Sequence, residues 1–277
     1  YRTRGTTLGK RGKIIRASLL TDADQRMSTS IKSLFLAALL TLPSTAIPDQ
    51  HHLKAMDIFD LEYATDPRVS PDGGSVVYVR KSFDVMADKS RSNIWQVNLD
   101  GSLHRPLLSA ANNYSSPRWS PEGNRIAYLT RYKKRNELRV RWLDTGQDAL
   151  IASTEKSPSS VTWSNNGEWI AFTMNVPGER NKLVKPRKKP EGAKWAQKSI
   201  EVDTVRYQFD GRGIVEPEYG QVFVVPGHGG TPRQLTTGHF DHDGQLSWSI
   251  DDDHILFAAN RHEDWELQTI ESDIYSV

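Results

Sequence analysis

Val69-Ser70-Pro71-Asp72-Gly73 is the first of four related turn sequences in this chain of 277 residues. The others begin at Trp119, Trp163 and Trp248, and they read Trp-Ser-Pro-Glu-Gly, Trp-Ser-Asn-Asn-Gly and Trp-Ser-Ile-Asp-Asp. Proline fixes φ at the second position of a turn, aspartate can bond its own backbone, and glycine accepts a positive φ. A stretch typical of a β-strand follows each copy. Self-similarity at a spacing of tens of residues indicates an architecture of stacked repeats.

Each repeat contains about four predicted strands. The second strand follows the turn, as in residues 75–80 and 125–130, and a third strand follows at 93–101 and 137–146, before a short fourth one. Four antiparallel strands are the content of one propeller blade, and the repeated serines are 50 and then 44 residues apart, as such blades require. We therefore predict an all-β fold, a β-propeller of four-stranded antiparallel blades, with the repeated tryptophans in the blade cores.

The third repeat is longer, because 85 residues separate Ser164 from Ser249. The excess predicts one long insertion at about residues 176–220. Residues 179–198 carry eight Lys or Arg and two Glu, and we interpret them as a solvated loop rather than as an anion or nucleic-acid site. Residues 204–213 alternate and then turn at Asp-Gly, which favours a hairpin that re-enters the blade. The sequence thus contains three blades and part of a fourth.

The first 46 residues have the character of a leader and an export signal. Residues 1–26 hold seven Lys or Arg against two Asp, and we interpret them as a non-native upstream leader, with a nucleic-acid-binding arm as the alternative. From Met27 to Ala46, one lysine, a short apolar run and a small-residue exit match a secretory signal peptide, with a buried amphipathic helix as the alternative. The run is shorter than the ~20 residues that a membrane span needs. We expect a periplasmic or secreted protein, with its propeller at residues 47–277 and no membrane span after cleavage.

Three short stretches contain residue types that are found in metal-binding or catalytic sites. Residues 239–243, His-Phe-Asp-His-Asp, hold metal-capable groups, but they fall where polar loops between blades are expected. Residues 251–253 are adjacent aspartates at a turn position, without the alternating carboxylates of a calcium loop. Residues 227–230, Gly-His-Gly-Gly, superficially resemble an oxyanion-hole motif, yet they occupy a turn between strands. We interpret all three as structural, and predict no metal, no cofactor and no catalytic residue in the chain.

Composition and missing motifs exclude several classes of chemistry. The chain has no cysteine, which excludes disulfides, thiolate catalysis and cysteine-based zinc sites. It has no Gly-x-Ser-x-Gly, no glycine-rich phosphate loop and no His-Glu-x-x-His. The net charge is only +2, and its positive excess comes from the leader, so we expect no nucleic-acid partner.

With these residues assembled, the chain resembles the propeller part of the prolyl oligopeptidase family of serine peptidases, in its acylaminoacyl-peptidase and dipeptidyl-peptidase branch. The resemblance spans about residues 58–277. It rests on Asp-Pro-Arg-Val-Ser-Pro-Asp-Gly at 66–73, the turn copy at 119–123, Arg-Tyr-Gln-Phe-Asp-Gly-Arg-Gly at 206–213 and Gly-Gly-Thr-Pro-Arg-Gln-Leu-Thr at 229–236. Other propellers, including TolB-like periplasmic ones, share the turn phrase, whereas the last two segments point to the peptidases.

The resemblance implies a propeller that caps a C-terminal α/β-hydrolase domain with a Ser-Asp-His triad, and no residue of this chain matches a triad position. The chain would then be the N-terminal part of an exported serine-type peptidase that hydrolyses short peptides, inactive by itself, with the propeller gating substrate access. Its partners would be peptide substrates and its own hydrolase domain. By this resemblance, Arg206 and Asp210 are candidates for holding a peptide terminus.

The alternative is a non-enzymatic, TolB-like periplasmic propeller that binds protein partners. In either case, three blades and a fragment leave strand edges exposed, because closed propellers need about four to eight blades. Exposed edges pair readily with other chains, so we expect this chain alone to be poorly soluble or to form homo-oligomers.

Overall fold

The computed structural model describes residues 52–178, 187–196, 202, 204–205, 207–242, 244–268 and 270–277. The predicted leader and signal peptide lie outside the described residues, as do much of the basic stretch at 179–198, Arg206 and Asp243. The fold is that of one compact unit, Lys54–Val277. Within the described part, no helix is long and apolar enough to cross a membrane.

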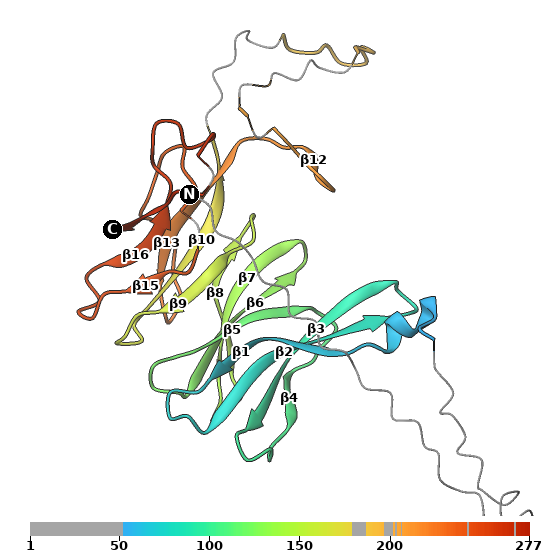
Figure 1. Ribbon diagram of the computed structural model, residues 1–277, viewed down its shortest axis with the longest axis vertical. Helices are drawn as coiled ribbons and strands as arrows, with labels where there is room; N and C mark the ends of the chain where they lie inside the picture. Colours follow the sequence, from blue (N-terminus) through green and yellow to red (C-terminus); the bar gives the residue numbers. More distant parts are fainter. Residues whose placement is uncertain are drawn as a thin grey trace, which may run out of the picture. The chain divides into compact units, whose positions relative to one another are not determined.

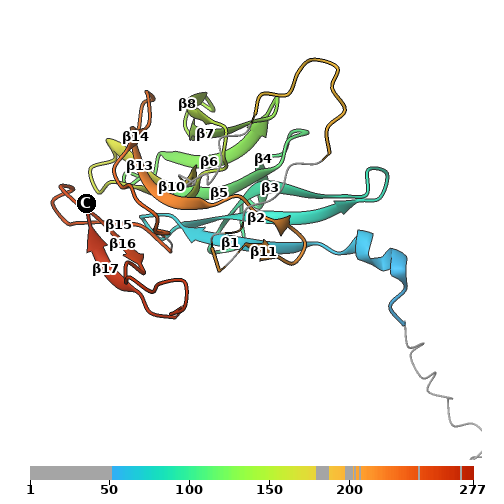
Figure 2. The same ribbon diagram turned by 90° about the horizontal axis from the view of Figure 1, so that it is seen from above.

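Four antiparallel sheets follow one another along the chain (Figure 1, Figure 2). The first contains β1 (Tyr63–Val69), β2 (Ser75–Asp84), β3 (Lys89–Asn98) and β4 (Arg105–Leu108). The second contains β5 (Tyr114–Trp119), β6 (Arg125–Tyr132), β7 (Arg135–Trp142) and β8 (Asp148–Thr154). The third contains β9 (Ser159–Trp163), β10 (Trp169–Pro177), β13 (Glu218–Pro226) and β14 (Arg233–Gln234), and the fourth contains β15 (Ser247–Trp248), β16 (Ile255–Ala259) and β17 (Asp273–Ser276). Neighbours in each sheet are consecutive along the chain apart from the insertion, which confirms the predicted four-stranded blades.

The insertion of the third sheet forms a small sheet of its own. β11 (Gln208–Phe209) and β12 (Gly213–Ile214) pair with each other and with no strand of the four larger sheets. The predicted hairpin therefore exists, but the expectation that it re-enters the blade is wrong. The hairpin finds no place beside β10, the strand that precedes it in the third sheet, because β10 pairs with β9 on one side and with β13 along its whole length on the other.

The repeated serine closes the turn between the first two strands of each of the four larger sheets. Its Oγ accepts the backbone N–H five residues later, with N···O distances of 2.9 Å at Ser70, 3.2 Å at Ser120, 2.9 Å at Ser164 and 3.0 Å at Ser249. The glycines of the first three copies have φ between +70° and +74°, and Asp252 takes this left-handed position in the fourth, at +60°. Because these bonds are local, the turn phrase specifies the same hairpin each time.

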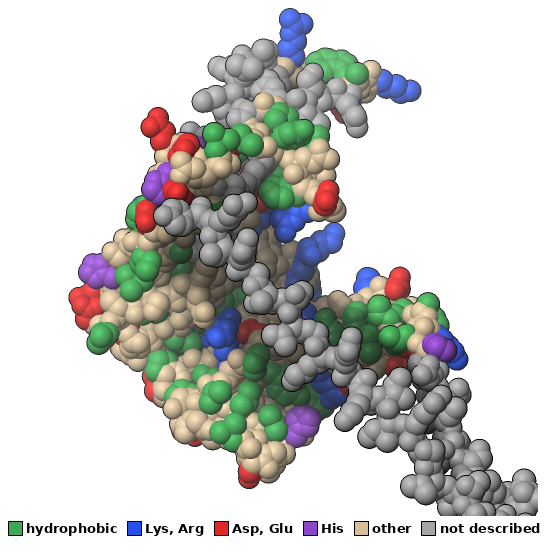
Figure 3. Space-filling model, viewed as in Figure 1, with side chains coloured by type: hydrophobic (Ala, Val, Ile, Leu, Met, Phe, Trp, Pro, Cys, Tyr) green, Lys and Arg blue, Asp and Glu red, His purple; other side chains and the backbone are tan. Residues whose placement is uncertain are grey.

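Apolar side chains fill the space between successive sheets, because side chains alternate between the two faces of a strand. Three clusters of buried residues result. They are represented by Val77, Ile94 and Ile126 between the first two sheets, by Leu138, Val140, Ile170 and Phe172 between the second and third, and by Ala171, Val222, Ile255 and Phe257 between the third and fourth. At the start of the first sheet, the 3-10 helix η1 (Ala55–Asp60) instead leaves Met56 and Ile58 exposed, and exposed apolar side chains of this region are visible in Figure 3.

The repeated tryptophans join neighbouring sheets. Trp163 is only 7% exposed, and its Nε1 donates a hydrogen bond to the backbone oxygen of Arg118 in the second sheet, at 3.1 Å. Trp119 donates in the same way to Arg68 in the first sheet, at 2.9 Å. Trp248 packs against the third cluster, but among the described residues its buried Nε1 has no partner. The prediction that these aromatic residues belong to the core is confirmed.

Candidate functional site

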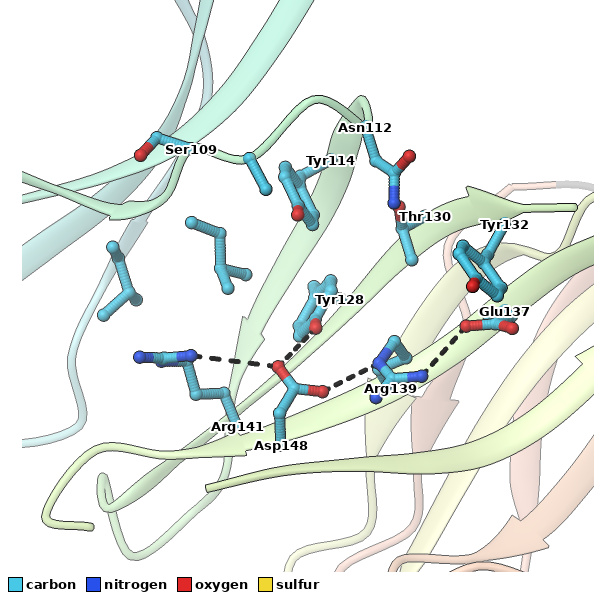
Figure 4. Close-up of a pocket in the computed structure, with 13 residues that line it drawn as sticks. Ser109, Asn112, Tyr114, Tyr128, Thr130, Tyr132, Glu137, Arg139, Arg141 and Asp148 are labelled. Atoms are coloured by element: carbon cyan, nitrogen blue, oxygen red, sulfur yellow. Dashed lines mark hydrogen bonds and ion pairs between the residues drawn. The ribbon is translucent and has the colours of Figure 1, made fainter. Parts of the chain in front are cut away.

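A groove of about 580 Å³ lies between the first and second sheets (Figure 4). β4 and the loop after it form one side, with Leu107, Leu108, Ser109, Ala110 and Asn112. The other side is the second sheet, which contributes Tyr114, Tyr128, Thr130, Tyr132, Glu137, Arg139, Arg141 and Asp148. The groove thus has an apolar side and a strongly polar one.

The polar side of the groove follows from the alternation of β7. In this strand Glu137, Arg139 and Arg141 face the groove, whereas Leu138 and Val140 between them are fully buried in the core toward the third sheet. The register places Tyr128 of β6 opposite Arg139, and Asp148 of β8 opposite Arg141. Directly opposed residues share a face of the sheet, so three strands contribute to one row of polar groups.

Most of these polar groups bond to one another. Asp148 accepts a hydrogen bond from the Tyr128 hydroxyl at 2.5 Å and another from Arg139 Nε at 2.7 Å. Arg139 also donates to Glu137 at 2.9 Å, and Glu137 is only 8% exposed. Figure 4 shows these residues as a continuous chain across the sheet. Such charge-assisted bonds hold their side chains in one arrangement.

The pKa values of Tyr128 and Arg139 are both raised above their ordinary values. Burial raises the pKa of Tyr128, and the hydrogen bond to Asp148 raises it further. Burial alone would lower the pKa of Arg139, but its hydrogen bonds to Asp148 and Glu137 outweigh this effect and raise the pKa. Both groups therefore keep their protons at neutral pH. The arrangement suits binding and orientation better than general acid–base catalysis, which needs a pKa near the working pH.

Arg141 is the exception in this network. Its NH1 lies 3.9 Å from Asp148 Oδ2, too far for a hydrogen bond, and no other described residue accepts a bond from its guanidinium. It extends on the opposite side of Asp148 from Arg139 (Figure 4). The groove therefore contains one guanidinium whose donors are available.

The candidate metal stretch of the sequence analysis has another role. Residues 239–242 are in a loop, where Asp241 accepts the backbone N–H of Gly220 at 2.8 Å and the His239 ring packs edge-on against Tyr219. Asp243 lies outside the described residues. In the part of the chain that is described, no three His, Cys, Asp or Glu side chains lie together as a metal site would require.

The other candidates are turns in the structure. Asp252 accepts the backbone N–H groups of Asn165 and Asn166, at 2.7 and 2.8 Å, and so links the turns of the third and fourth sheets. Residues 227–230 turn between β13 and β14, with positive φ at Gly229. Asp210 is exposed at the β11–β12 turn, and Arg206 lies outside the described residues. None of these candidates lines the groove, which the sequence analysis missed although residues 137–141 alternate between charged and apolar side chains.

Comparisons with known proteins agree with the fold. The family model described as "PD40: TolB beta propeller domain" matches residues 75–275. The uncharacterized peptidase YuxL of Bacillus subtilis is 29% identical over 214 residues, which are 76% of this chain and 32% of that protein. Dipeptidyl-peptidase 5 of Porphyromonas gingivalis is 26% identical over 165 residues, 58% of this chain and 24% of that protein. The Tol-Pal system protein TolB of Pseudomonas aeruginosa is 34% identical over 68 residues, 24% of this chain and 16% of that protein.

Among solved structures, the acylaminoacyl peptidase of Pyrococcus horikoshii superposes with a TM-score of 0.57 at 19% identity, over 79% of this chain and 32% of that one. This likeness shows a shared fold. The chain spans about a third or less of the length of these peptidases. The chain belongs to the PD40 family of TolB β-propeller domains, and corresponds to the propeller portion of prolyl oligopeptidase-family peptidases.

Proposed function

We propose that this chain is the N-terminal propeller of an exported serine-type peptidase, and that it controls which peptides reach a Ser-Asp-His catalytic domain in the same polypeptide. The observation that carries the proposal is the match to a peptidase over 76% of this chain but only 32% of the relative. Acyl transfer by serine needs a nucleophile, a histidine base and an oxyanion hole, and in this proposal the catalytic domain supplies all three.

The first strands of the sheets support a role in gating, because they are tied to one another. Arg118 of β5 donates to Asp66 of β1 at 2.8 Å, and its Nε donates to the backbone oxygen of Val161 in β9 at 3.1 Å. One side chain thus joins three sheets, and the tryptophan bonds add further links. A scaffold held this tightly can exclude large substrates by size, whereas a loosened one would admit them.

Labelling of the full-length polypeptide with a fluorophosphonate probe tests the peptidase assignment. We expect one labelled serine, located outside residues 1–277, together with hydrolysis of short peptide substrates. A folded full-length protein that takes up no probe and cleaves no peptide would contradict the assignment.

Gating is tested separately by the ratio of cleavage rates for a tripeptide and a 30-residue peptide. Replacement of Arg118 by glutamine should raise the relative rate for the longer peptide, because it releases both inter-sheet bonds. Arg135→Gln is the control, since Arg135 bonds only within the second sheet and to the loop after it. An unchanged ratio in a folded Arg118→Gln protein would refute gating without affecting the peptidase assignment.

Export is proposed from the signal-like sequence at Met27 to Ala46. Amino-terminal sequencing of the protein recovered from the periplasm or medium should begin at Ile47. Recovery only from the cytoplasm with residues 27–46 intact would contradict export.

The second candidate function is that of a periplasmic propeller that binds proteins. It is favoured by the family description and by the match to TolB over 68 residues. Absence of probe labelling, combined with specific crosslinking of the full-length protein to periplasmic proteins, would favour this function over the peptidase.

A further inference from the structure

Two arginines that line the groove between the first two sheets differ from the residues at the equivalent positions of the neighbouring repeats. The second strands of the first three sheets begin at Ser75, Arg125 and Trp169, each five residues after the repeated serine, and these residues pair with Asn98, Trp142 and Pro226. Residues at the same distance before these partners occupy equivalent positions in the third strands of the three sheets. The relevant positions are three residues and one residue before each partner. Arg139 corresponds to Trp95 and Phe223, and Arg141 corresponds to Val97 and Val225.

Apolar residues occupy both positions in the first and third sheets. Val225 is fully buried and Phe223 is 7% exposed, and both belong to the core that faces the second sheet. Partly buried charges carry a desolvation penalty, and apolar replacements of similar volume are often neutral or stabilising. Packing therefore does not account for two arginines at these positions, and only Arg139 has its hydrogen bonds made within the sheet, to Asp148 and Glu137.

The polar side chains of the groove fall into a hydrogen-bonded network and one guanidinium outside it. Glu137, Arg139, Asp148 and the Tyr128 hydroxyl bond to one another, and this fixes the Asp148 carboxylate. Arg141 stays beside that carboxylate through a single ion pair at 3.9 Å. Its position is therefore restrained while its hydrogen-bond donors remain available to a ligand.

The groove also has the size and the apolar contact that a ligand needs. Its volume of about 580 Å³ falls within the range of roughly 300–1,000 Å³ that is usual for small-molecule sites. Leu107 and Leu108 form the side contributed by the first sheet, and Tyr114 is a buried aromatic residue of the lining. An apolar group can bind against these side chains while a charged group reaches Arg141.

We propose that this groove binds a carboxylate carried on an apolar group, with the Arg141 guanidinium donating hydrogen bonds to the carboxylate and Leu107, Leu108 and Tyr114 contacting the apolar part. Guanidinium and carboxylate match as paired donors and acceptors, which makes arginine well suited to this recognition. The free C-terminus of a peptide and a small carboxylic acid share this chemistry. The inference does not rest on the proposed peptidase function.

Calorimetric titration of the protein with N-acetyl-leucine, N-acetyl-leucinamide and 4-methylpentanoate tests the proposal. N-acetyl-leucine should bind saturably, and its amide, which lacks the carboxylate, should bind roughly tenfold more weakly or not at all. Tighter binding of N-acetyl-leucine than of 4-methylpentanoate identifies a peptide C-terminus as the source, and equal binding identifies a small carboxylic acid. Equal binding of the acid and its amide, or no saturable binding of either acid, would overturn the proposal.

Arg141→Val is the matched variant, because valine is the residue at this position in the first and third sheets. We expect it to keep or raise the melting temperature and to lose N-acetyl-leucine affinity by roughly tenfold or more. Arg135→Val, on the same strand outside the groove, should bind as the unmodified protein does. Should Arg141→Val fail to fold, Arg141→Lys decides, since it keeps the charge but loses the paired geometry. Unchanged affinity in the folded variant overturns the proposal.

Discussion

Replacement of Trp163 by phenylalanine removes the indole N–H that joins the second and third sheets, and we expect it to lower the free energy of unfolding by about 2–4 kcal/mol. The lost hydrogen bond to the Arg118 backbone oxygen, 3.1 Å long, contributes about 1 kcal/mol. The Arg125 guanidinium lies 4.7 Å from the centre of the indole ring, and weakening this contact costs about 0.5–1 kcal/mol. The space left by the smaller ring in a buried cluster accounts for the remainder.

Trp248→Phe is the matched control, because Trp248 occupies the same repeat position without the hydrogen bond. Among the described residues its Nε1 has no partner, so Trp248→Phe loses packing contacts but no hydrogen bond. We expect it to lower the free energy of unfolding by about 1 kcal/mol or less. Trp119→Phe should resemble Trp163→Phe in losing an inter-sheet bond, here the one of 2.9 Å to Arg68.

The assay is urea unfolding followed by far-UV circular dichroism, since a fluorescence signal would change with the number of tryptophans. The comparison is between midpoints at equal slope, because a change in slope would mean that the unfolded or native state itself had changed. Equal destabilisation by Trp163→Phe and Trp248→Phe would refute the reasoning, because it would mean that the inter-sheet hydrogen bond contributes nothing.

Three further outcomes follow from individual side chains. Burial lowers the pKa of His242, so the folded protein holds this side chain neutral and gains stability from it above the unfolded pKa of about 6.5. The melting temperature should therefore fall as the pH is lowered from about 6.5 through the folded pKa of His242. The fall should be smaller in His242→Gln, which has no imidazole to protonate. Asp66→Asn breaks the ion pair between the first two sheets and should lower stability by about 1 kcal/mol at low salt, with a smaller loss in thermal scans at 1 M salt. Ser116 and Ser160 both have positive φ, but of the two only Ser160 donates a side-chain hydrogen bond to the backbone oxygen of Gly244. In urea titrations, Ser116→Gly should therefore be neutral or stabilising by about 0.5 kcal/mol, whereas Ser160→Gly should be destabilising.

Sequence reasoning identified the sheets of the fold because their decisive interactions are local. The serine of each turn bonds within five residues, as between Ser70 and Ser75, and the glycine or Asp252 supplies the left-handed position. Strand alternation then separates core residues such as Leu138 and Val140 from their neighbours. These features need no information about distant parts of the chain.

The hairpin at residues 208–214 was harder to place. Its alternation and its Asp-Gly turn are sufficient to predict two paired strands, which the structure contains. Whether such a hairpin joins a larger sheet depends on which strands already pair with its neighbours in the sequence. β13 occupies the relevant edge of β10, and this competition between segments cannot be read from either segment alone.

The repeated turn phrase by itself determined the class of fold, the division into sheets and the place of the tryptophans, since hydrogen bonds and strand periodicity act over a few residues. The tertiary structure alone decided what lies between the sheets. Arg139 and Arg141 look like ordinary charged residues of an alternating strand. Only the register places them opposite Tyr128 and Asp148, and only the fold brings Leu107 and Leu108 of β4 to the other side of the groove. A groove is made by residues distant in sequence, and its chemistry depends on which of their charges are already paired, which only their positions in space determine.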